Sequence, residues 1–456
     1  EKLMTPGTPF AARLETTRYL EQYDAASDAE KFALVRRWMD TEPLPFFAEL
    51  RAQRPVLVTP VCTLVTRLLD VMDVLSQPTV FTVELYQPKM KDYLMTHDDD
   101  ALHTREKSIM RGFLNRDDLP KVRELVAQIS RGILDAAGGR MEAVNEYCRM
   151  APARLVQEYF GLDGADPKDL IEWSYWNQYN AFHNYPFDLI SDELRQHIVA
   201  RHEEVNKQLA MYLTGLIARK LVHVKGQQAG HFLLWPVYLV RKLWRLLLRK
   251  KYELQDDVVS RMLRTSYPEA VEFDIQRLGL NAGGLLIGAV ETTSQAVAQV
   301  IQYLLDREAL LAEAVAAARR QDPKEFDGIV WEALRFVPIG AFLFRKAAQD
   351  CALARGTAHE TVVRAGTIVL AVTQSAMFDA AAFENPEEFI PGRNWYHYFH
   401  FGFGSHECLG KYVGMVMIPE MVRQVLLRPG IQARGPLDYK SGPLPEQYEL
   451  SWSTNA

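Results

Sequence analysis

Cysteine is scarce in this chain of 456 residues, and the few cysteines are far apart. The four are Cys62, Cys148, Cys351 and Cys408, and no two of them form a CxxC pair. This spacing argues against a disulfide framework and against a structural zinc site, and it fits a reducing cytosol. Any cysteine that stands in a strongly patterned context therefore needs another explanation.

Long apolar segments and an excess of positive charge are also missing. The longest uninterrupted apolar run, from Phe232 to Val240, has nine residues and contains a proline, whereas a membrane-spanning helix needs about 20. The first residues, EKLMTPGTPF, lack the basic and then apolar pattern of a secretory signal, so we expect a cytoplasmic protein. The net charge of −6 gives no footprint for nucleic acid, and we expect no such partner.

Helical patterns dominate what is present. The segment 274–307 is apolar nearly all round, which predicts one buried helix of about 50 Å through the middle of a large domain. Short β-branched stretches, such as TVVRAGTIVLAVT at 361–373, predict a minor sheet. We therefore expect a mainly α fold with a minor β region (α+β). It forms a single large domain over 44–456, preceded by an N-terminal extension, 1–43, that carries no usable motif.

One glycine-rich stretch, FGFGSHECLG from Phe401 to Gly410, surrounds Cys408. Glycines let a backbone turn tightly and approach a flat cofactor. The following residues read as a helix, whose free N–H groups and dipole should lower the pKa of the Cys408 thiol. Such a thiolate can hold haem iron as a single axial ligand, and His406 could reach a haem propionate. The alternative is a buried free cysteine in a tight turn.

The pattern Phe401-x-x-Gly404-x-His406-x-Cys408-x-Gly410 resembles the cysteine-loop signature of the cytochrome P450 family. The resemblance covers roughly residues 44–430 and is clearest in the C-terminal half. It implies the cytochrome P450 fold, with haem b (iron protoporphyrin IX) between the long central helix and the cysteine loop. Cys408 would be the proximal iron ligand, Phe401 would pack near its sulfur, and His406 and Gly410 would belong to the haem-binding loop.

Two further motifs support the resemblance. Glu332-Ala-Leu-Arg335 matches the family's ExxR motif, in which the spacing places carboxylate and guanidinium on one helix face. Phe389-x-Pro391-x-Arg393 matches the meander motif that follows. The resemblance implies that Glu332, Arg335 and Arg393 form a buried charge triad. For an ExxR motif alone, the alternative is a solvated surface pair.

The segment GAVETT, residues 288–293, is similar to the family's oxygen-activating segment. The resemblance implies that Glu291 and Thr292 form an acid–alcohol pair that relays protons to dioxygen. Two alternatives stay open. Glu291 could instead form a structural ion pair with a distant arginine, and Thr292 could bond back to a carbonyl one turn earlier and bend the helix. The order Gly288-Ala289 departs from the family pattern and brings an extra methyl group nearer the acid.

Helical spacing from Thr292 also gives candidates for a substrate pocket. The candidates are Leu285, Gly288, Ala289 and Thr293 on the central helix, with Val337 and Ile339 after the ExxR motif. By the resemblance, the aromatic-rich stretch 171–190 lies near a lid over the substrate channel, the alternative being ordinary core packing. These residues suggest an apolar substrate.

Three more residues are expected to bind haem propionates. His103 and Lys107 match the family's HxxxR helix motif, with lysine where arginine is usual. Lysine keeps the charge but loses the bidentate fork of arginine. Arg345 matches a further propionate-binding arginine of the family. The alternative for Lys107 and Arg345 is a surface charge.

An insertion at 222–252 replaces the short link that most soluble members of the family have here. Within it Arg241, Arg245 and Arg249 fall four apart among leucines and aromatics, which predicts a basic amphipathic helix. Residues 232–251 would contact a membrane surface or a protein partner. The alternative is a cover helix packed on the core.

Together these patterns predict a monooxygenase that hydroxylates or epoxidises an apolar small molecule, such as a lipid, terpenoid, polyketide or aromatic compound. The chain has no GxGxxG motif in context and no cysteine cluster, so we expect electrons from a separate ferredoxin or flavodoxin and its reductase. Two alternatives are a peroxide-using peroxygenase or hydroperoxide-rearranging enzyme, and a haem-binding sensor or carrier without turnover.

Overall fold

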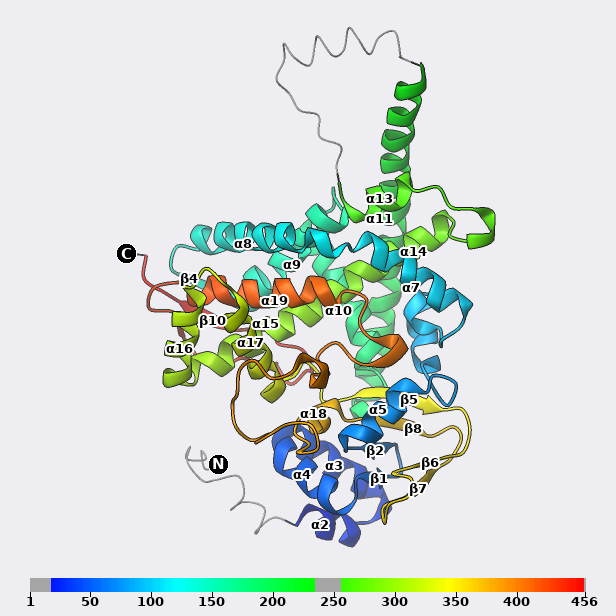
Figure 1. Cartoon of the computed structure of the whole chain (residues 1–456), viewed down its shortest axis with the longest axis vertical. Coiled ribbons are helices and arrows are strands. Elements are labelled where there is room, and N and C mark those ends of the chain that lie inside the picture. Colours follow the sequence, from blue (N-terminus) through cyan, green and yellow to red (C-terminus); the bar gives the residue numbers. More distant parts are fainter. Residues whose placement is uncertain (1–17, 234–255, 455–456) are drawn as a thin grey trace.

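Helices make up most of the molecule, and the sheets are small (Figure 1). The computed structural model describes residues 18–233 and 256–454. The prediction of a mainly α fold with a minor β region is confirmed. Among the described residues, no helix is long and apolar enough to cross a membrane.

The first helices cover the largest sheet. They are α2 (Tyr19–Ala25), α3 (Asp28–Thr41) and α4 (Pro43–Gln53). A capping box between Ser27 and Glu30 fixes the start of α3. Trp38 and Phe46 pack in one apolar cluster with Leu64 and Leu370 of the sheet. The described part of the predicted N-terminal extension thus shares a core with strands from both ends of the chain.

Five strands form the largest sheet, in the order β1-β2-β8-β5-β3. Their bounds are Val56–Val58 (β1), Thr63–Val65 (β2), Phe81–Thr82 (β3), Leu343–Ala347 (β5) and Ile368–Ala371 (β8). A three-stranded sheet has the order β4-β10-β9, with β4 at Arg140–Glu142, β9 at Gln432–Ala433 and β10 at Glu449–Ser451. The hairpin of β6 (Cys351–Leu353) and β7 (Thr361–Val363) completes the strands of the described ranges.

The helical body follows the sheet residues along the chain. Its first half contains α5 (Leu68–Ser76), α6 (Gln87–Met90), α7 (Ala101–Phe113), α8 (Leu119–Ala136), α9 (Met150–Leu155), α10 (Pro167–Phe182) and α11 (Asp192–Leu233). Its second half contains α13 (Val258–Arg264), α14 (Ile275–Ala289), α15 (Glu291–Leu305), α16 (Glu308–Ala318), α17 (Lys324–Phe336), α18 (Thr373–Ala376) and α19 (Lys411–Leu426). Helices α14 and α15 run through the middle, with α10 packed on α14 and α19 packed on α15 (Figure 1).

The prediction of one continuous helix over 274–307 is wrong. The segment forms two helices, α14 and α15, that are interrupted at Val290, whose φ and ψ are −87° and −66°. The hydroxyl of Thr292 donates to the carbonyl of Gly288 at 2.8 Å, which takes up a carbonyl of the last turn of α14. Apolar periodicity does not register this local competition for backbone groups.

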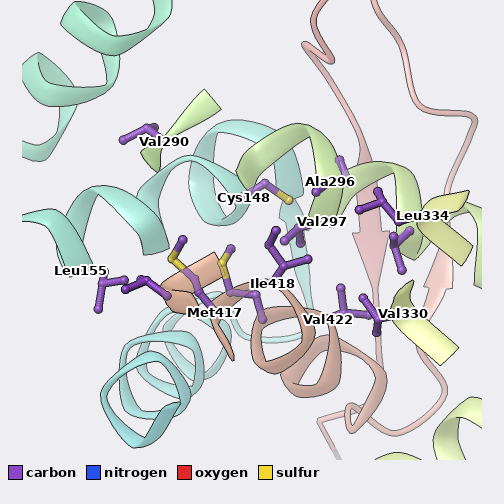
Figure 2. Close-up of a cluster of buried hydrophobic side chains, with 14 of the residues drawn as sticks. Cys148, Leu155, Val290, Ala296, Val297, Val330, Leu334, Met417, Ile418 and Val422 are labelled. Atoms are coloured by element: carbon purple, nitrogen blue, oxygen red, sulfur yellow. The ribbon is translucent and has the colours of Figure 1, made fainter. Parts of the chain in front are cut away.

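Beneath the interruption lies the main apolar core (Figure 2). Val290 and Val297 of the central segment are fully buried and belong to the same cluster as Val330 of α17 and Val422 of α19. Cys148 is part of this cluster, and burial raises the pKa of its thiol well above the ordinary value. Tight packing here fixes the central helices on α17 and α19, which flank the cysteine loop.

The predicted insertion, 222–252, begins inside α11. That helix continues to Leu233, and its end rises away from the body in Figure 1. Residues 234–252, with the three predicted arginines and most of the proposed contact segment 232–251, lie outside the described residues.

Candidate functional site

The cysteine loop turns sharply before α19. Gly402 and Gly404 both have φ of +76°, a conformation that other residues rarely adopt. A Cβ on Gly404 would also lie 2.4 Å from the carbonyl oxygen of Leu75. The amide of Cys408 donates to the carbonyl of Phe401 at 2.8 Å. These constraints place Cys408 three residues before the first residue of α19.

Phe401 packs directly against α19. A Cβ on Gly414 would lie 2.7 Å from the Phe401 ring, so only glycine admits the ring there. The ring also meets the edge of Trp331 of α17, at a centroid distance of 5.8 Å. Phe401 therefore locks the cysteine loop to both α17 and α19.

The thiol of Cys408 is accessible, yet the protein around it is dense enough to desolvate a charge. Burial raises the pKa of Cys408, while a hydrogen bond from the Gly410 amide and the charges of Lys107 and Lys411 lower it. The effect of burial is the largest, so the pKa of the Cys408 thiol is raised, and the predicted lowering of this pKa is wrong for the protein alone. Metal coordination requires the thiolate, so binding iron and losing this proton are coupled.

The residues around Cys408 fit a haem with two propionates. The rings of His103 and His406 are in contact, with centroids 4.5 Å apart, and none of their nitrogens makes a hydrogen bond, although Nδ1 of His103 lies 3.6 Å from the carboxylate of Asp99. Arg345 of β5 is 5% exposed and donates to the carbonyl of Phe344 at 2.8 Å. Among the described residues, no carboxylate lies within ion-pair distance of Arg345. Buried donors without acceptors are costly, and two propionate groups would satisfy them.

The same cluster resists gaining further positive charge. Burial lowers the pKa of His406 to about 2, and the neighbouring Arg345, His103 and Lys107 lower it further. Burial likewise lowers the pKa of Arg345. Burial disfavours a charge of either sign, whereas the positive charges of Arg345 and Lys107 favour an anion at this place.

Lys107 takes a place that its motif did not predict. Its ammonium donates to the carbonyls of Ser405 and Glu407, the latter at 2.7 Å. Lysine is suited to this contact because its three donors can turn toward separate acceptors. In this structure Lys107 holds the cysteine loop to α7, and its predicted contact with a propionate stays a prediction.

The three residues of the predicted charge triad are brought together. Arg335 and Glu332 form a fully buried pair at 2.6 Å, and Arg393 reaches Glu332 at 3.0 Å. Tyr398 and the amide of Ile390 also donate to the carboxylate. Burial alone would raise the pKa of Glu332, but these donors hold it below the ordinary value. The triad ties α17 to the meander that leads into the cysteine loop.

Glu291 is fully buried and lies in an ion pair. Its oxygens accept from Nε of Arg149 at 3.0 and 3.2 Å, and Arg149 also pairs with Glu446 at 3.1 Å. Burial raises the pKa of Glu291 to about 7, against the opposing effect of Arg149. The structure therefore contains the ion pair considered as the alternative for Glu291. It also gives this carboxyl a pKa at which it can both take and release a proton near neutral pH.

The predicted pocket residues divide into two groups. Gly288 is exposed, and Ala289, Val337 and Ile339 are partly exposed. In contrast, Leu285 and Thr293 are buried in the packing, at 5% and 3% exposure. At the interruption the accessible residues of the central segment are Gly288, Ala289 and Thr292, whereas Val290 and Glu291 are buried.

Sequence reasoning missed several residues around this turn. Tyr93 lies against Gly284, where a Cβ would come within 2.2 Å of the ring. Burial raises the pKa of its phenol, and the charge of Cys408 raises it further. Arg149 was missed because its partner is 142 residues away, and no local pattern marks such a pair. The adjacent glycines at 283 and 284 were the only local signal for a close contact there.

The loop cysteine lies near two histidines whose ring nitrogens make no hydrogen bond and near a buried arginine without a carboxylate partner. In a helical domain, these are the features of a haem-thiolate protein. Among the described residues, no cluster of three or more histidine, cysteine or acidic residues is placed to hold a metal. The family model described as "Cytochrome P450" matches residues 155–428, which is more than half of the chain. The chain belongs to the cytochrome P450 family, and the resemblance stated from its motifs is confirmed.

Relatives and solved structures agree with this membership. The chain is 26% identical over 319 residues to the mycinamicin IV hydroxylase/epoxidase of Micromonospora griseorubida, covering 69% of this chain and 66% of that protein. It is 25% identical over 381 residues to the cyclomarin C epoxidase CymV of Salinispora arenicola, covering 79% and 82%. The fold resembles that of substrate-free CYP109E1 from Bacillus megaterium, with a TM-score of 0.71 at 18% identity, over 90% and 99% of the two chains.

Membership settles the enzyme class and the cofactor. The chain is a haem-dependent cytochrome P450 monooxygenase, as predicted. Enzymes of this class generally take electrons from redox partners and act on small molecules.

Proposed function

We propose that this enzyme hydroxylates or epoxidises an apolar small molecule, with electrons from a separate ferredoxin or flavodoxin and its reductase. One atom of dioxygen enters the substrate, and the other leaves as water after two electrons and two protons are consumed. The names of the two relatives, a hydroxylase/epoxidase and an epoxidase, support this reaction type. The substrate classes we favour are lipids, terpenoids, polyketides and aromatic compounds.

The interrupted turn of the central helix carries this proposal. Thr292 presents a hydroxyl on the accessible face of the turn, hydrogen-bonded to the Gly288 carbonyl. The next residue toward the N-terminus, Glu291, has a pKa of about 7. In this proposal the Glu291 carboxyl supplies protons from the buried side of the turn, and the Thr292 hydroxyl passes them to a reacting oxygen on the accessible face. This pair favours dioxygen chemistry over a peroxide-using reaction, which needs no delivered protons.

Each remaining site residue has a defined part in the proposal. Cys408 would hold the haem iron, and His103, His406 and Arg345 would hold its propionates. When bound, haem held by this thiolate would receive electron density that favours cleavage of the O–O bond. On the substrate side, Ala289, Val337 and Ile339 offer apolar, partly exposed surface, which suits a substrate without charge.

A turnover assay tests the proposal. Purified protein with a ferredoxin, its reductase and NADPH is screened against fatty acids, terpenoids, macrolides and aromatic compounds under isotopically labelled dioxygen. We expect at least one compound to gain one labelled oxygen atom. Product formation with hydrogen peroxide alone, and none with dioxygen and reductant, would overturn the proposal in favour of a peroxygenase.

The variant Thr292→Val sharpens this assay. Valine has nearly the shape of threonine but no hydroxyl, so reductant consumption should continue while protons reach the oxygen less efficiently. We expect product per NADPH to fall on the order of 10²-fold, the lower end of what a positioned proton donor contributes, with hydrogen peroxide rising in proportion. Unchanged coupling of reductant to product would remove Thr292 from the mechanism.

A further inference from the structure

The interruption of the central helix leaves carbonyl groups that a continuous helix would use itself. In an uninterrupted helix, the carbonyl of Ile287 would accept the amide of Glu291. Because α14 ends at Ala289 and α15 begins at Glu291, the last carbonyls of α14 need other donors. The Gly288 carbonyl receives the hydroxyl of Thr292. The preceding carbonyl, that of Ile287, accepts hydrogen bonds from side chains of a different helix.

Two side chains of α10 supply those donors. The amide of Gln178 donates to the Ile287 carbonyl at 2.6 Å. The hydroxyl of Ser174 lies 3.4 Å from the same oxygen and 3.5 Å from the carbonyl oxygen of Leu286. Gln178 and Ser174 are four residues apart, so they lie on one face of α10, and that face packs on α14.

The burial of these two polar side chains needs such a partner. Gln178 is 5% exposed and Ser174 is fully buried. An apolar residue would fill the interface between two helices without the cost of desolvating an amide or a hydroxyl. Hydrogen bonds to the open carbonyls of the interrupted turn offset that desolvation cost. The interruption of the central helix thus accounts for the buried polar residues on α10, and these residues in turn satisfy the carbonyls that the interruption leaves open.

A second set of contacts joins α10 to the Glu291 carboxyl of the same turn. Tyr175 of α10 donates to Glu446 at 2.7 Å. Glu446 pairs with Arg149, which in turn pairs with Glu291. Helix α10 thus reaches both groups of the acid–alcohol pair: the backbone that holds Thr292 and the ion pair that holds Glu291.

We infer that Gln178, assisted by Ser174, is a positioning residue that keeps the central helix open at residues 287–291. By occupying the Ile287 carbonyl, its amide prevents the helix from closing and thereby sets where the Thr292 hydroxyl points. The catalytic consequence rests on the function proposed above. The structural part, an α10 side chain that holds the helix open, does not depend on it.

The test compares Gln178→Met with a matched control. Methionine keeps the length of glutamine but has no donor. The control is Asn177→Met, because Asn177 is equally buried on α10 but its amide donates to the carbonyl of Trp173 in its own helix, at 2.8 Å. Ser174→Ala removes the weaker donor and serves as the milder variant if Gln178→Met does not fold.

The first measurement is amide hydrogen exchange of the holoenzyme at residues 288–294, without turnover. In Gln178→Met the freed carbonyl can accept the amide of Glu291, so exchange there should slow by about tenfold, the amount that one net hydrogen bond is worth. The Asn177→Met control should leave this segment unchanged. Unaltered exchange in Gln178→Met, or an equal change in both variants, would overturn the inference.

The second measurement is coupling of reductant to product, alone and in combination with Thr292→Val. Gln178→Met should lower coupling several-fold with the KM for substrate unchanged. The double variant should couple no worse than Thr292→Val alone, because Gln178 acts through that hydroxyl. Additive losses would show that Gln178 acts elsewhere. If the wild type forms no product at all, the proposed function fails, while hydrogen exchange still decides the positioning role.

Discussion

Replacement of Arg335 by methionine is expected to lower the free energy of unfolding by about 3–5 kcal/mol, the cost of leaving a buried charge without its partner. The carboxylate of Glu332 would keep Arg393 but lose its bidentate contact. Arg335 also donates to the carbonyls of Met377 and Pro386, which would be left without it. Because domains are stable by only about 5–15 kcal/mol, this loss should be visible as poor haem retention. Urea denaturation followed by circular dichroism measures it.

Two comparisons separate the triad from an ordinary ion pair. Arg364 pairs with Asp350 on the surface, with side chains 75% and 52% exposed, so Arg364→Met should cost less than about 1 kcal/mol. Glu332→Gln leaves both Arg335 and Arg393 without their carboxylate and should be at least as destabilising as Arg335→Met. An Arg335→Met protein as stable as Arg364→Met would contradict a structural role for the triad.

Replacement of Glu291 by glutamine is expected to lower the rate of product formation by about 10²-fold or more, because in the proposed function this carboxyl is the proton donor. The wild type should also show a pH dependence set by this group. With a pKa of about 7, the carboxyl is protonated and able to donate below that pH. The rate at saturating substrate should therefore be level below about pH 7 and fall above it. Steady-state rates from pH 5.5 to 9 measure both effects.

Glu106→Gln provides the matched control for Glu291→Gln. Glu106 is also fully buried and pairs with an arginine, Arg277, and with the amide of Asn281. It lies on α7, away from the interrupted turn, so its loss should reduce stability and leave the pH profile in place. A Glu291→Gln enzyme that keeps the inflection near pH 7 would assign that inflection to another group.

The cysteine loop and the charge triad were predictable from sequence because their motifs resemble those of the cytochrome P450 family. Gly404, Cys408 and Arg335 each stand in one of these motifs. The structure adds reasons that the motifs do not contain, for example the carbonyl of Leu75 that excludes any side chain at Gly404. The mainly α fold class, in contrast, followed from helical periodicity.

The features that could not be predicted from sequence depend on contacts between residues that are far apart along the chain. At the interruption the freed carbonyls accept from the nearby Thr292 hydroxyl and from Gln178 of α10, which is more than 100 residues earlier, and apolar periodicity predicts neither contact. The buried partner of Glu291 had no local signal. Lys107 matched its motif but turned to the cysteine loop, because the carbonyls of Ser405 and Glu407 lie within its reach.

The central claim is that Cys408 is the thiolate ligand of the haem, and one spectrum tests it most directly. The difference spectrum of the reduced protein with carbon monoxide should show the long-wavelength band of thiolate-ligated haem. Cys408→Ala should abolish that band, and Cys351→Ala, which removes a partly exposed cysteine from β6, should retain it. A long-wavelength band that persists in Cys408→Ala would contradict the assignment.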